Sequence, residues 1–345
     1  MTIPPRYAKQ ALFAGIGSEG QAAIGRSRVV ICGCGATGGV LAELLARAGV
    51  GFIRVVDRDF VERGNLQRQV LFDERDAAER TPKAIAAAAR LRAINGEIEI
   101  APVVADIGPE NVLSLVESCD LILDGTDNFE TRFLLNDASH ETGIPWIYCG
   151  VIGGHGQTMT ILPGATACLR CLIETPPEPG VVETCDTAGV IGPAVTGVAS
   201  LAAAEAMKLL AGRRELIQPR LLVCDVWEGT VRSIDTTALR KRGTCPACDR
   251  GERPWLNAEV GSRAAILCGR KAVQITPADR CEVALSEMAE RLAPTGQIVQ
   301  TPYLLRLSMV EPACEITIFR DGRAIIQGTE DIATARALYA RLIGL

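Results

Sequence analysis

Two Cys-x-x-Cys pairs are the residues whose type and spacing point most directly to chemistry. They are Cys168 with Cys171 and Cys245 with Cys248. Four thiolates form a tetrahedral ligand set for structural zinc. Each pair forms a local knuckle, so the long separation of the pairs in the sequence weakens the prediction of a zinc site little. A redox dithiol and a chance coincidence of two pairs are the alternatives. Neither pair is expected to open a helix after a strand, as a redox dithiol does, and the sequence therefore predicts a structural zinc site.

A glycine-rich segment between an apolar run and a helix predicts a nucleotide-binding turn. Gly33, Gly35 and Gly38 have the spacing at which backbone N–H groups approach phosphate at the N-terminus of a helix. A second apolar run ends in Asp57, and an acid about twenty residues past such glycines suits a ribose hydroxyl. Packing of the turn alone is the alternative for an isolated glycine triplet. The two strands and the acid together favour nucleotide binding.

Further polar side chains follow the short apolar run 121–123. Asp124 and Asp127 stand where this run ends, and a carboxylate there can hold Mg²⁺ against nucleotide phosphates. Alternatively, Asp127 caps the helix that follows, and the two roles are compatible. Lys83 and Arg68 could neutralise phosphate charge, although each alone is a common type of solvated surface residue.

Strands and helices alternate through residues 28–149, and this alternation is what must position the candidate site. It predicts a doubly wound, mainly parallel, Rossmann-like α/β sheet with helices on both faces. We further expect a helix over 6–25, a turn over 153–157, a strand over 158–162 and a buried helix over about 191–211. After a linker over 249–256, the tail is expected to form a small α+β module, with strands over 271–276, 303–309, 315–319 and 324–326 and helices over 286–292 and 331–343.

Composition excludes several classes of function. The 345 residues carry a net charge of −5, which argues against a surface for nucleic acid or anionic membrane. The first residues lack the apolar run of a signal peptide, and the thirteen cysteines are more plausible as metal ligands, reactive thiols or core residues than as disulfides, so we expect a cytoplasmic protein. Cysteines in apolar runs, expected in the core, are Cys32, Cys34, Cys119, Cys149 and Cys224. His140 and His155 lack metal-ligand spacing.

Several motifs occur in one order over about residues 5–250, and together they resemble the MoeB/ThiF family, relatives of ubiquitin-activating enzymes. Besides the glycines and the zinc pairs, they are Asp57-x-Asp59, Asn65-Leu66-Gln67-Arg68-Gln69, Pro82-Lys83 and Asp124-x-Thr126-Asp127-Asn128. The resemblance implies an ATP-dependent adenylyltransferase that activates the C-terminal glycine carboxylate of a small ubiquitin-like sulfur-carrier protein ending in Gly-Gly. The product is an acyl-adenylate, pyrophosphate leaves, and the pathway is molybdopterin, thiamine or related cofactor biosynthesis.

The resemblance also implies a role for each matching residue. Asp57, with Asp59 in the same motif, would bind the ribose side of ATP, and Asp127 would hold Mg²⁺. Asn65, Arg68 and Lys83 would contact the triphosphate and stabilise charge on the α-phosphate and the leaving pyrophosphate.

Two further roles come from the resemblance alone. In the family, an arginine of the N-terminal helix often enters the ATP site of the partner subunit of a homodimer; here Lys9 stands in its place, with the charge but without the bidentate fork. Cys185 aligns with a cysteine that relatives use in sulfur transfer or thioester chemistry, and an ordinary loop cysteine is the alternative. The expected organisation is an adenylation domain with the zinc site over 1–250, followed over 251–345 by a small domain that could dock a partner.

Two other hypotheses compete with this one. A nicotinamide-dependent oxidoreductase would explain the glycine turn but leaves Arg68, Lys83, Asp127 and the cysteine pairs without a joint role. A non-catalytic scaffold with a degenerate activating-enzyme fold needs none of Arg68, Lys83 and Asp127, and the presence of all three speaks against it. Preference for ATP over NAD would separate the first two hypotheses, and turnover would separate an enzyme from a scaffold.

Overall fold

The computed structural model describes residues 3–175, 188–259, 264–267, 271–276, 282–310 and 312–343. The chain divides into two compact units, Met1–Val260 and Gly261–Leu345, and each is described here by itself. We refer to them as the N-terminal unit and the C-terminal unit.

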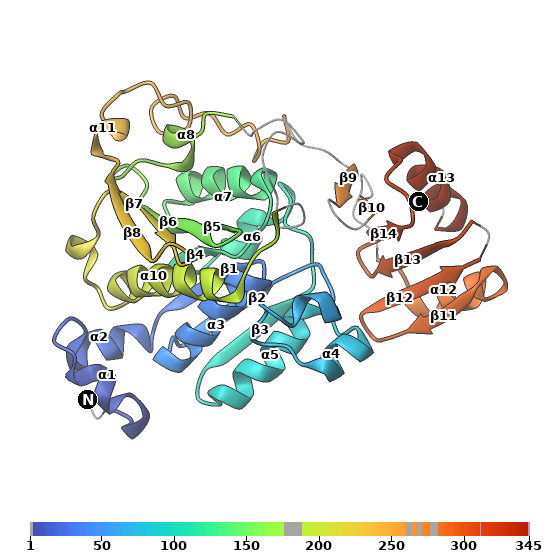
Figure 1. Cartoon of the computed structure of the whole chain (residues 1–345), viewed down its shortest axis with the longest axis horizontal. Helices are drawn as coiled ribbons and strands as arrows, with labels where there is room; N and C mark the ends of the chain where they lie inside the picture. The colour runs from blue at the N-terminus through green and yellow to red at the C-terminus, as the bar shows by residue number, and fades with distance from the viewer. Residues whose placement is uncertain are drawn as a thin grey trace. The chain divides into compact units, whose positions relative to one another are not determined.

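A twisted sheet forms the centre of the N-terminal unit, and its described strands lie in the order β3-β2-β1-β4-β5-β6-β7-β8 (Figure 1). Strands β3 to β5 of this order pair in parallel, and β6, β7 and β8 are added as antiparallel strands. The mainly parallel, doubly wound α/β sheet expected from the sequence is thus confirmed. The strands are β1 (Arg28–Cys32), β2 (Phe52–Val56), β3 (Glu99–Val103), β4 (Leu121–Asp124), β5 (Trp146–Ile152), β6 (His155–Ile161), β7 (Arg220–Asp225) and β8 (Thr230–Asp235).

Helices cover both faces of this sheet because the buried strands are apolar on both sides. Val29 and Ile31 of β1 pack into a core with α3, α5 and α10, whereas Val30 and Cys32 pack into a second core with α6 and α7 (Figure 1). The helices of the unit are α1 (Ala8–Leu12), α2 (Gly17–Ile24), α3 (Ala36–Ala48), α4 (Glu74–Glu79), α5 (Lys83–Ile94), α6 (Val112–Val116), α7 (Phe129–Thr142), α8 (Leu169–Leu172), α10 (Gly192–Leu210) and α11 (Thr237–Arg240), with 3-10 turns η1 (Pro5–Tyr7), η2 (Arg63–Asn65) and η3 (Arg214–Leu216).

Helix α10 is long and apolar enough to cross a membrane by length and composition, and among the described helices it alone meets that test. Its side chains Val195, Ala199 and Ala202 are buried in the core beneath the sheet. It is therefore the core helix that the sequence predicts, and Glu205 within it is paired with Lys208 and Arg220 at 2.8 and 3.1 Å.

The structure corrects two expected elements of this unit. The helix expected over 6–25 is broken after Leu12, where Phe13 takes an extended conformation before α2 begins at Gly17. The turn expected over 153–157 is shorter, because β6 already begins at His155 and pairs with Ile152 of β5. The cysteines expected in the core, from Cys32 to Cys224, are all buried.

The C-terminal unit is a small α+β module, as its sequence predicts. Its described strands form an antiparallel sheet in the order β11-β12-β13-β14-β10-β9, and α12 and α13 pack on the apolar face of that sheet. The elements are β9 (Ala264–Leu267), β10 (Ala272–Ile275), α12 (Leu285–Leu292), η4 (Ala293–Thr295), β11 (Gln297–Gln300), β12 (Leu304–Met309), β13 (Cys314–Phe319), β14 (Ala324–Gln327) and α13 (Ile332–Leu342). Strands β9 and β11 are not predicted by the sequence pattern.

Three glycines pack backbone against backbone where β1 meets α3. Gly33 has a φ of +87°, and a Cβ on Gly38 would lie 1.9 Å from the Gly33 carbonyl oxygen. A Cβ on Gly125, just past β4, would lie 2.1 Å from the same oxygen. These contacts leave no room for a side chain, so the glycine spacing is first of all a packing requirement that brings the β1–α3 turn against the β4–α7 loop.

This packing predicts opposite effects for two adjacent helical glycines. Gly38→Ala should lower the free energy of unfolding by roughly 1–3 kcal/mol or more, because backbone atoms must shift to admit the methyl group. Gly39→Ala is the matched control: its Cβ would meet nothing closer than 3.7 Å. Alanine there should be neutral or stabilise by up to about 1 kcal/mol. Urea unfolding measures both values, and equal stability of the two variants would contradict the backbone contact.

Candidate functional site

The carboxyl ends of three parallel strands bring the predicted nucleotide-site residues to one edge of the sheet. Cys32 at the end of β1 pairs with Val56 of β2 on one side and with Asp124 of β4 on the other. The chain crosses over between these neighbours, so β1 and β4 flank the topological switch point, which is where ligands bind in open α/β sheets. The glycine turn, the segment after Val56 and the segment after Asp124 therefore meet there.

Gly35 is the glycine of this turn that has free space beside its Cα atom. A Cβ on Gly35 would lie 3.6 Å from Nε2 of Gln69 and would meet no other neighbour, in contrast to Gly33 and Gly38. Gln69 is itself buried, and its Oε1 has no hydrogen-bond partner. The open glycine beside an unused buried acceptor fits a polar ligand that approaches the backbone of the turn. Gln69 lies in a predicted motif, but the sequence did not single it out.

Asp57 fixes the turn rather than pointing freely at a ligand. It is 8% exposed, and its Oδ2 accepts the N–H of Cys34 at 2.6 Å while its Oδ1 accepts the N–H of Asp59 at 2.8 Å. Burial raises the pKa of Asp57, and the nearby Lys83 ammonium opposes that shift. Each carboxylate oxygen keeps a lone pair, so the group is oriented at the strand end and can still accept a further hydrogen bond.

Lys83 lies at the same edge, where an ion pair holds it. It opens α5, is 4% exposed, and its Nζ lies 3.2 Å from Oδ2 of Asp59. Arg58 lies 3.0 Å from Asp106. Burial lowers the pKa of the Arg58 guanidinium, but the carboxylates of Asp106, Asp59 and Asp127 together hold it above its usual value. Arg58 and Asp106 are charged residues of the site that the sequence reasoning missed; the dense charge of 58–63 was the available signal.

The loop between β2 and α4 carries the next two predicted residues. Asn65 is 5% exposed, and its Oδ1 accepts the N–H of Glu62 at 3.3 Å, which closes the 3-10 turn η2. Arg68 is half-buried, and its Nη1 donates to the carbonyl oxygen of Gly64 at 2.9 Å. The loop is therefore ordered by its own side chains, with the Arg68 guanidinium still partly exposed to solvent.

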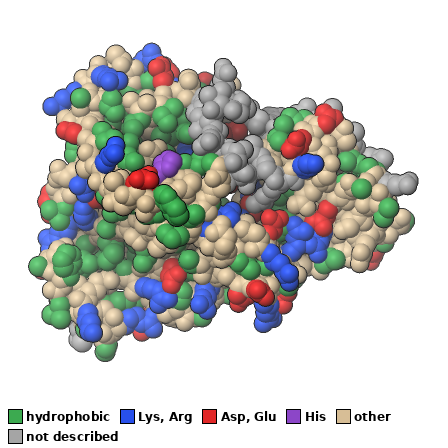
Figure 2. Space-filling view, viewed as in Figure 1, with side chains coloured by type: hydrophobic (Ala, Val, Ile, Leu, Met, Phe, Trp, Pro, Cys, Tyr) green, Lys and Arg blue, Asp and Glu red, His purple; other side chains and the backbone are tan. Residues whose placement is uncertain are grey.

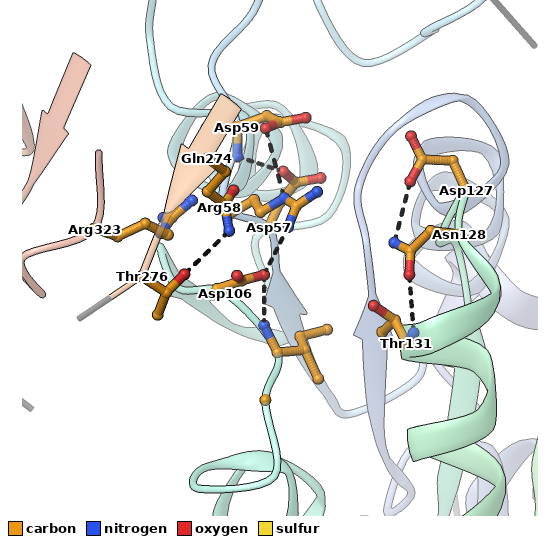
Figure 3. A network of polar contacts seen from close by, with 12 residues as sticks. Asp57, Arg58, Asp59, Asp106, Asp127, Asn128, Thr131, Gln274, Thr276 and Arg323 are labelled. Atoms are coloured by element: carbon orange, nitrogen blue, oxygen red, sulfur yellow. Dashed lines mark hydrogen bonds and ion pairs between the residues drawn. The ribbon is translucent and has the colours of Figure 1, made fainter. Parts of the chain in front are cut away.

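Asp127 remains available for a ligand, whereas Asp124 does not. Asp124 is fully buried, lies 3.3 Å from Nε of Arg132, and accepts two hydrogen bonds from Thr126; burial raises its pKa against the Arg132 charge. Asp127 is exposed, and its contact in the described residues is a 3.4 Å hydrogen bond from Nδ2 of Asn128. Asn128, not Asp127, caps α7, through Oδ1 and the N–H of Thr131 at 2.8 Å (Figure 3). The alternative that Asp127 is a helix cap is wrong.

Lys9 is not brought to this edge within one chain. It is exposed on α1, which is attached to the opposite edge: Nε2 of Gln10 donates to the carbonyl oxygen of Ala48 at 2.9 Å. Helix α3 begins at the glycine turn and ends at Ala48, and its 13 residues span about 19 Å. Cys185 lies outside the described residues.

The four predicted zinc ligands lie together. Sγ of Cys168 is 3.7 Å from that of Cys245 and 3.8 Å from that of Cys171, and Sγ of Cys171 is 3.7 Å from that of Cys248. All four sulfur atoms lie within 4.8 Å of one another. A tetrahedron with zinc–sulfur bonds of about 2.3 Å has edges of about 3.8 Å, so the spacing fits zinc, whereas a disulfide requires about 2.05 Å.

Two details of the zinc cluster differ from expectation. Cys168 immediately precedes the one-turn helix α8, so the first pair does open a short helix. A metal is favoured over a redox dithiol because the two cysteine pairs contact each other, and not because a helix is absent. His140 of α7 also approaches the cluster, with Nε2 3.8 Å from Sγ of Cys248. Burial lowers the pKa of His140 to about 4, so the ring is neutral at pH 7 and can donate an N–H to the sulfur.

On the face drawn in Figure 2, basic and acidic side chains are interspersed rather than gathered into one basic patch. This distribution agrees with the net charge of −5 and gives that face no electrostatic preference for nucleic acid.

Comparison with known proteins identifies relatives of the whole chain. The model of the ThiF family matches residues 7–247. The chain is 43% identical to the sulfur carrier protein ThiS adenylyltransferase of Bacillus subtilis, over 98% of this chain and 99% of that protein. It is 40% identical to the SAMP-activating enzyme E1 of Haloferax volcanii, over 71% of this chain and 89% of that protein. The Bacillus match extends beyond the family model into the C-terminal unit.

The fold also matches solved structures. A crystal structure of Escherichia coli MccB with ATP superposes with a TM-score of 0.61 at 23% identity, over 70% of this chain and 74% of that one. At this identity the match demonstrates a shared fold.

The cysteine geometry predicts one bound zinc ion per chain. Cys171→Ala should abolish zinc retention and lower the melting temperature, because removing one thiolate leaves an incomplete tetrahedron. Cys224→Ala is the matched control, since Cys224 is buried outside the cluster. Elemental analysis of protein purified without chelators checks the prediction, and zinc retained in full by Cys171→Ala would refute this ligand set.

Proposed function

The chain belongs to the ThiF family, and from this premise we propose that it is an ATP-dependent adenylyltransferase acting on a small ubiquitin-like sulfur-carrier protein. The reaction joins the C-terminal glycine carboxylate of the carrier to the α-phosphate of ATP and releases pyrophosphate. The observation that supports the proposal is the convergence of three segments, those that carry Lys83, Arg68 and Asp127, on the carboxyl ends of β1, β2 and β4, where Gln69 lies beside the open Gly35. The near full-length similarity to a ThiS adenylyltransferase makes a ThiS-type carrier the first substrate to test.

Charge neutralisation is what this site must provide. A carboxylate is a weak nucleophile and is repelled by an anionic phosphate, so the barrier falls when cations are held against the phosphate oxygens. Lys83 and Arg68 supply fixed positive charge, and Asn65 supplies an amide that can donate. Asp127 would hold Mg²⁺, which when bound neutralises further charge on the phosphates. No covalent intermediate with the protein is needed for this step.

The backbone of the glycine turn and Asp57 account for nucleoside and phosphate positioning. Gly35 is the N-cap of α3, where the first N–H groups of the helix and the helix dipole favour negative charge. Asp57 keeps an acceptor lone pair for a ribose hydroxyl, with Asp59 beside it as the counter-ion of Lys83. A nicotinamide enzyme would use the turn and Asp57 but would leave Arg68, Lys83 and Asp127 without a role.

The active form is proposed to be a homodimer in which Lys9 of one chain enters the ATP site of the other. The supporting observation is the position of α1 at the edge opposite the glycine turn, about the length of α3 away, so Lys9 cannot serve the site of its own chain.

Asp127→Asn should reduce carrier-dependent ATP–pyrophosphate exchange by roughly 100-fold and raise the Mg²⁺ concentration for half-maximal rate, because the metal loses an anionic ligand. Glu74→Gln is the control, since Glu74 is an exposed acid in the first turn of α4. Exchange is measured with a ThiS-type carrier ending in Gly-Gly. Wild-type rates in Asp127→Asn at all Mg²⁺ concentrations would remove Asp127 from the proposal, and absence of exchange in the wild type with every such carrier would refute the function.

Complementation tests the Lys9 proposal. Lys9→Ala alone should lose most activity, and so should Asp127→Asn. A mixture of equal amounts, unfolded and refolded together, should recover about a quarter of wild-type activity, because half of the dimers are mixed and each mixed dimer has one intact site. Full activity of Lys9→Ala alone, or no recovery on mixing, would contradict a role in trans.

A further inference from the structure

An exposed tryptophan lies on the turn between β7 and β8, and the site described above does not use it. Trp227 is 79% exposed, whereas the other tryptophans, Trp146 and Trp255, are 0% and 8% exposed. Exposed tryptophans are costly in water and are enriched among the residues that dominate binding energy at protein interfaces. Trp227 is therefore a candidate anchor for a protein partner.

The turn that carries Trp227 is rigid. Oδ1 of Asp225 accepts the N–H groups of Trp227 and Glu228, both at 3.0 Å. The other side of the turn rests on the β5–β6 hairpin, because Val226 donates its N–H to the carbonyl oxygen of Gly154 at 3.0 Å. A side chain held in place before binding loses little conformational entropy on binding, which favours an anchor role.

Strand register places this turn at the same edge of the sheet as the nucleotide site. Ile152 of β5 pairs with His155 of β6, His155 pairs with Asp225 of β7, and Asp225 pairs with Thr230 of β8. The carboxyl end of β5 therefore continues sideways to Trp227. Three strand spacings, or roughly 14 Å, separate β4, which leads to Asp127, from β7. Because Leu123 of β4 pairs with Ile147, the turn also lies about 13 Å further along the strands than the end of β4.

In the part of the chain that the structure describes, glycines lie between the two points. Gly153 exchanges hydrogen bonds with the segment before α10: its N–H donates to Gly189 at 2.9 Å, and its carbonyl oxygen accepts from Ile191 at 3.1 Å. At the start of α10, a Cβ on Gly192 would lie 3.2 Å from the carbonyl oxygen of Gln67, the neighbour of Arg68. Glycines thus connect the Trp227 turn with the loop that carries Arg68.

Strand β8, next to the turn, is also exposed to solvent. It is the edge strand of the sheet in the part of the chain that the structure describes, and all of its residues are exposed. Val231 is 63% and Ile234 is 50% exposed. An edge strand with unpaired backbone groups and exposed apolar side chains is a site at which another protein can add.

We propose that Trp227, together with Val231 on β8, docks the body of the sulfur-carrier protein, whose C-terminal tail runs over Gly153 and Gly154 to the nucleotide edge. This inference rests on the proposed function and names the surface that recognises its protein substrate. The offsets across and along the strands combine to about 19 Å, which an extended tail of about six residues spans. Glycines at the end of the tail can lie close to the backbone of Gly153 and Gly154 because they lack side chains.

Quenching of tryptophan fluorescence by acrylamide tests the docking directly, since Trp227 is the exposed tryptophan. A ThiS-type carrier ending in Gly-Gly, free of tryptophan, should reduce the quenching saturably, and the same carrier without its last glycine should also protect but support no exchange. Trp227→Phe should remove the quenchable emission. In ATP–pyrophosphate exchange, Trp227→Ala should raise the KM for the carrier at least about 10-fold, with the KM for ATP and the limiting rate unchanged. Leu216→Ala, an exposed apolar control on η3, should leave all three unchanged.

The possible outcomes distinguish a failure of the docking surface from a failure of the proposed function. If wild-type protein catalyses exchange but the carrier neither protects Trp227 nor loses affinity for Trp227→Ala, the docking surface is wrong and the proposed function stands. If no carrier supports exchange, the proposed function fails and the docking inference fails with it. Protection that increases with protein concentration in the absence of carrier would assign the surface to a contact between two copies of this chain and overturn the proposal.

Discussion

The backbone contact among Gly33, Gly38 and Gly125 is the constraint on which the site depends. It brings the β1–α3 turn against the β4–α7 loop at a separation that no Cβ permits. The same turn is held from the other side, because Asp57 at the end of β2 accepts the N–H of Cys34. Three strand ends are thus fixed to one another by contacts to the backbone. The exposed Asp127 and the partly exposed Arg68 are consequently not needed to hold these strand ends together.

Helix α7 connects the β4–α7 loop to the cysteine cluster. Its first turn follows Asp127, and Arg132 one turn later donates to the carbonyl oxygens of Thr126 and Cys149 at 2.7 and 3.2 Å. Oδ1 of Asn136 on the same helix accepts the N–H of Leu169 in α8 at 3.0 Å. One helix therefore carries the Asp127 loop at one end and supports the first cysteine knuckle further along. The cysteine cluster, far from Asp127 in sequence, thus contacts the helix that positions the proposed magnesium ligand.

The sequence predicts the parts of this arrangement that depend on local patterns. Alternating apolar runs give the sheet, the glycine spacing gives the turn, and paired cysteines give the metal cluster. It does not predict that Asn128 rather than Asp127 caps α7, since both are good caps and only the tertiary fold decides which faces the helix. Gln69, Arg58 and Asp106 were missed because burial and partners, not residue type, distinguish them. Strand β11 has only Ile298 and Val299 as apolar residues and forms by pairing with β12.

Asp59 and Asp106 keep the cations at this edge of the sheet charged in the absence of a ligand. Lys83 is almost fully buried, and a buried ammonium without a counter-ion would lose its proton or destabilise the fold. Asp59 supplies that counter-ion at 3.2 Å, and Asp106 does the same for Arg58. Carboxylates in a site for an anion are thus expected, because they hold the cations charged and oriented in its absence. In the proposed reaction, an entering phosphate would replace one anionic partner of these cations with another, and the cations would not need to be desolvated again.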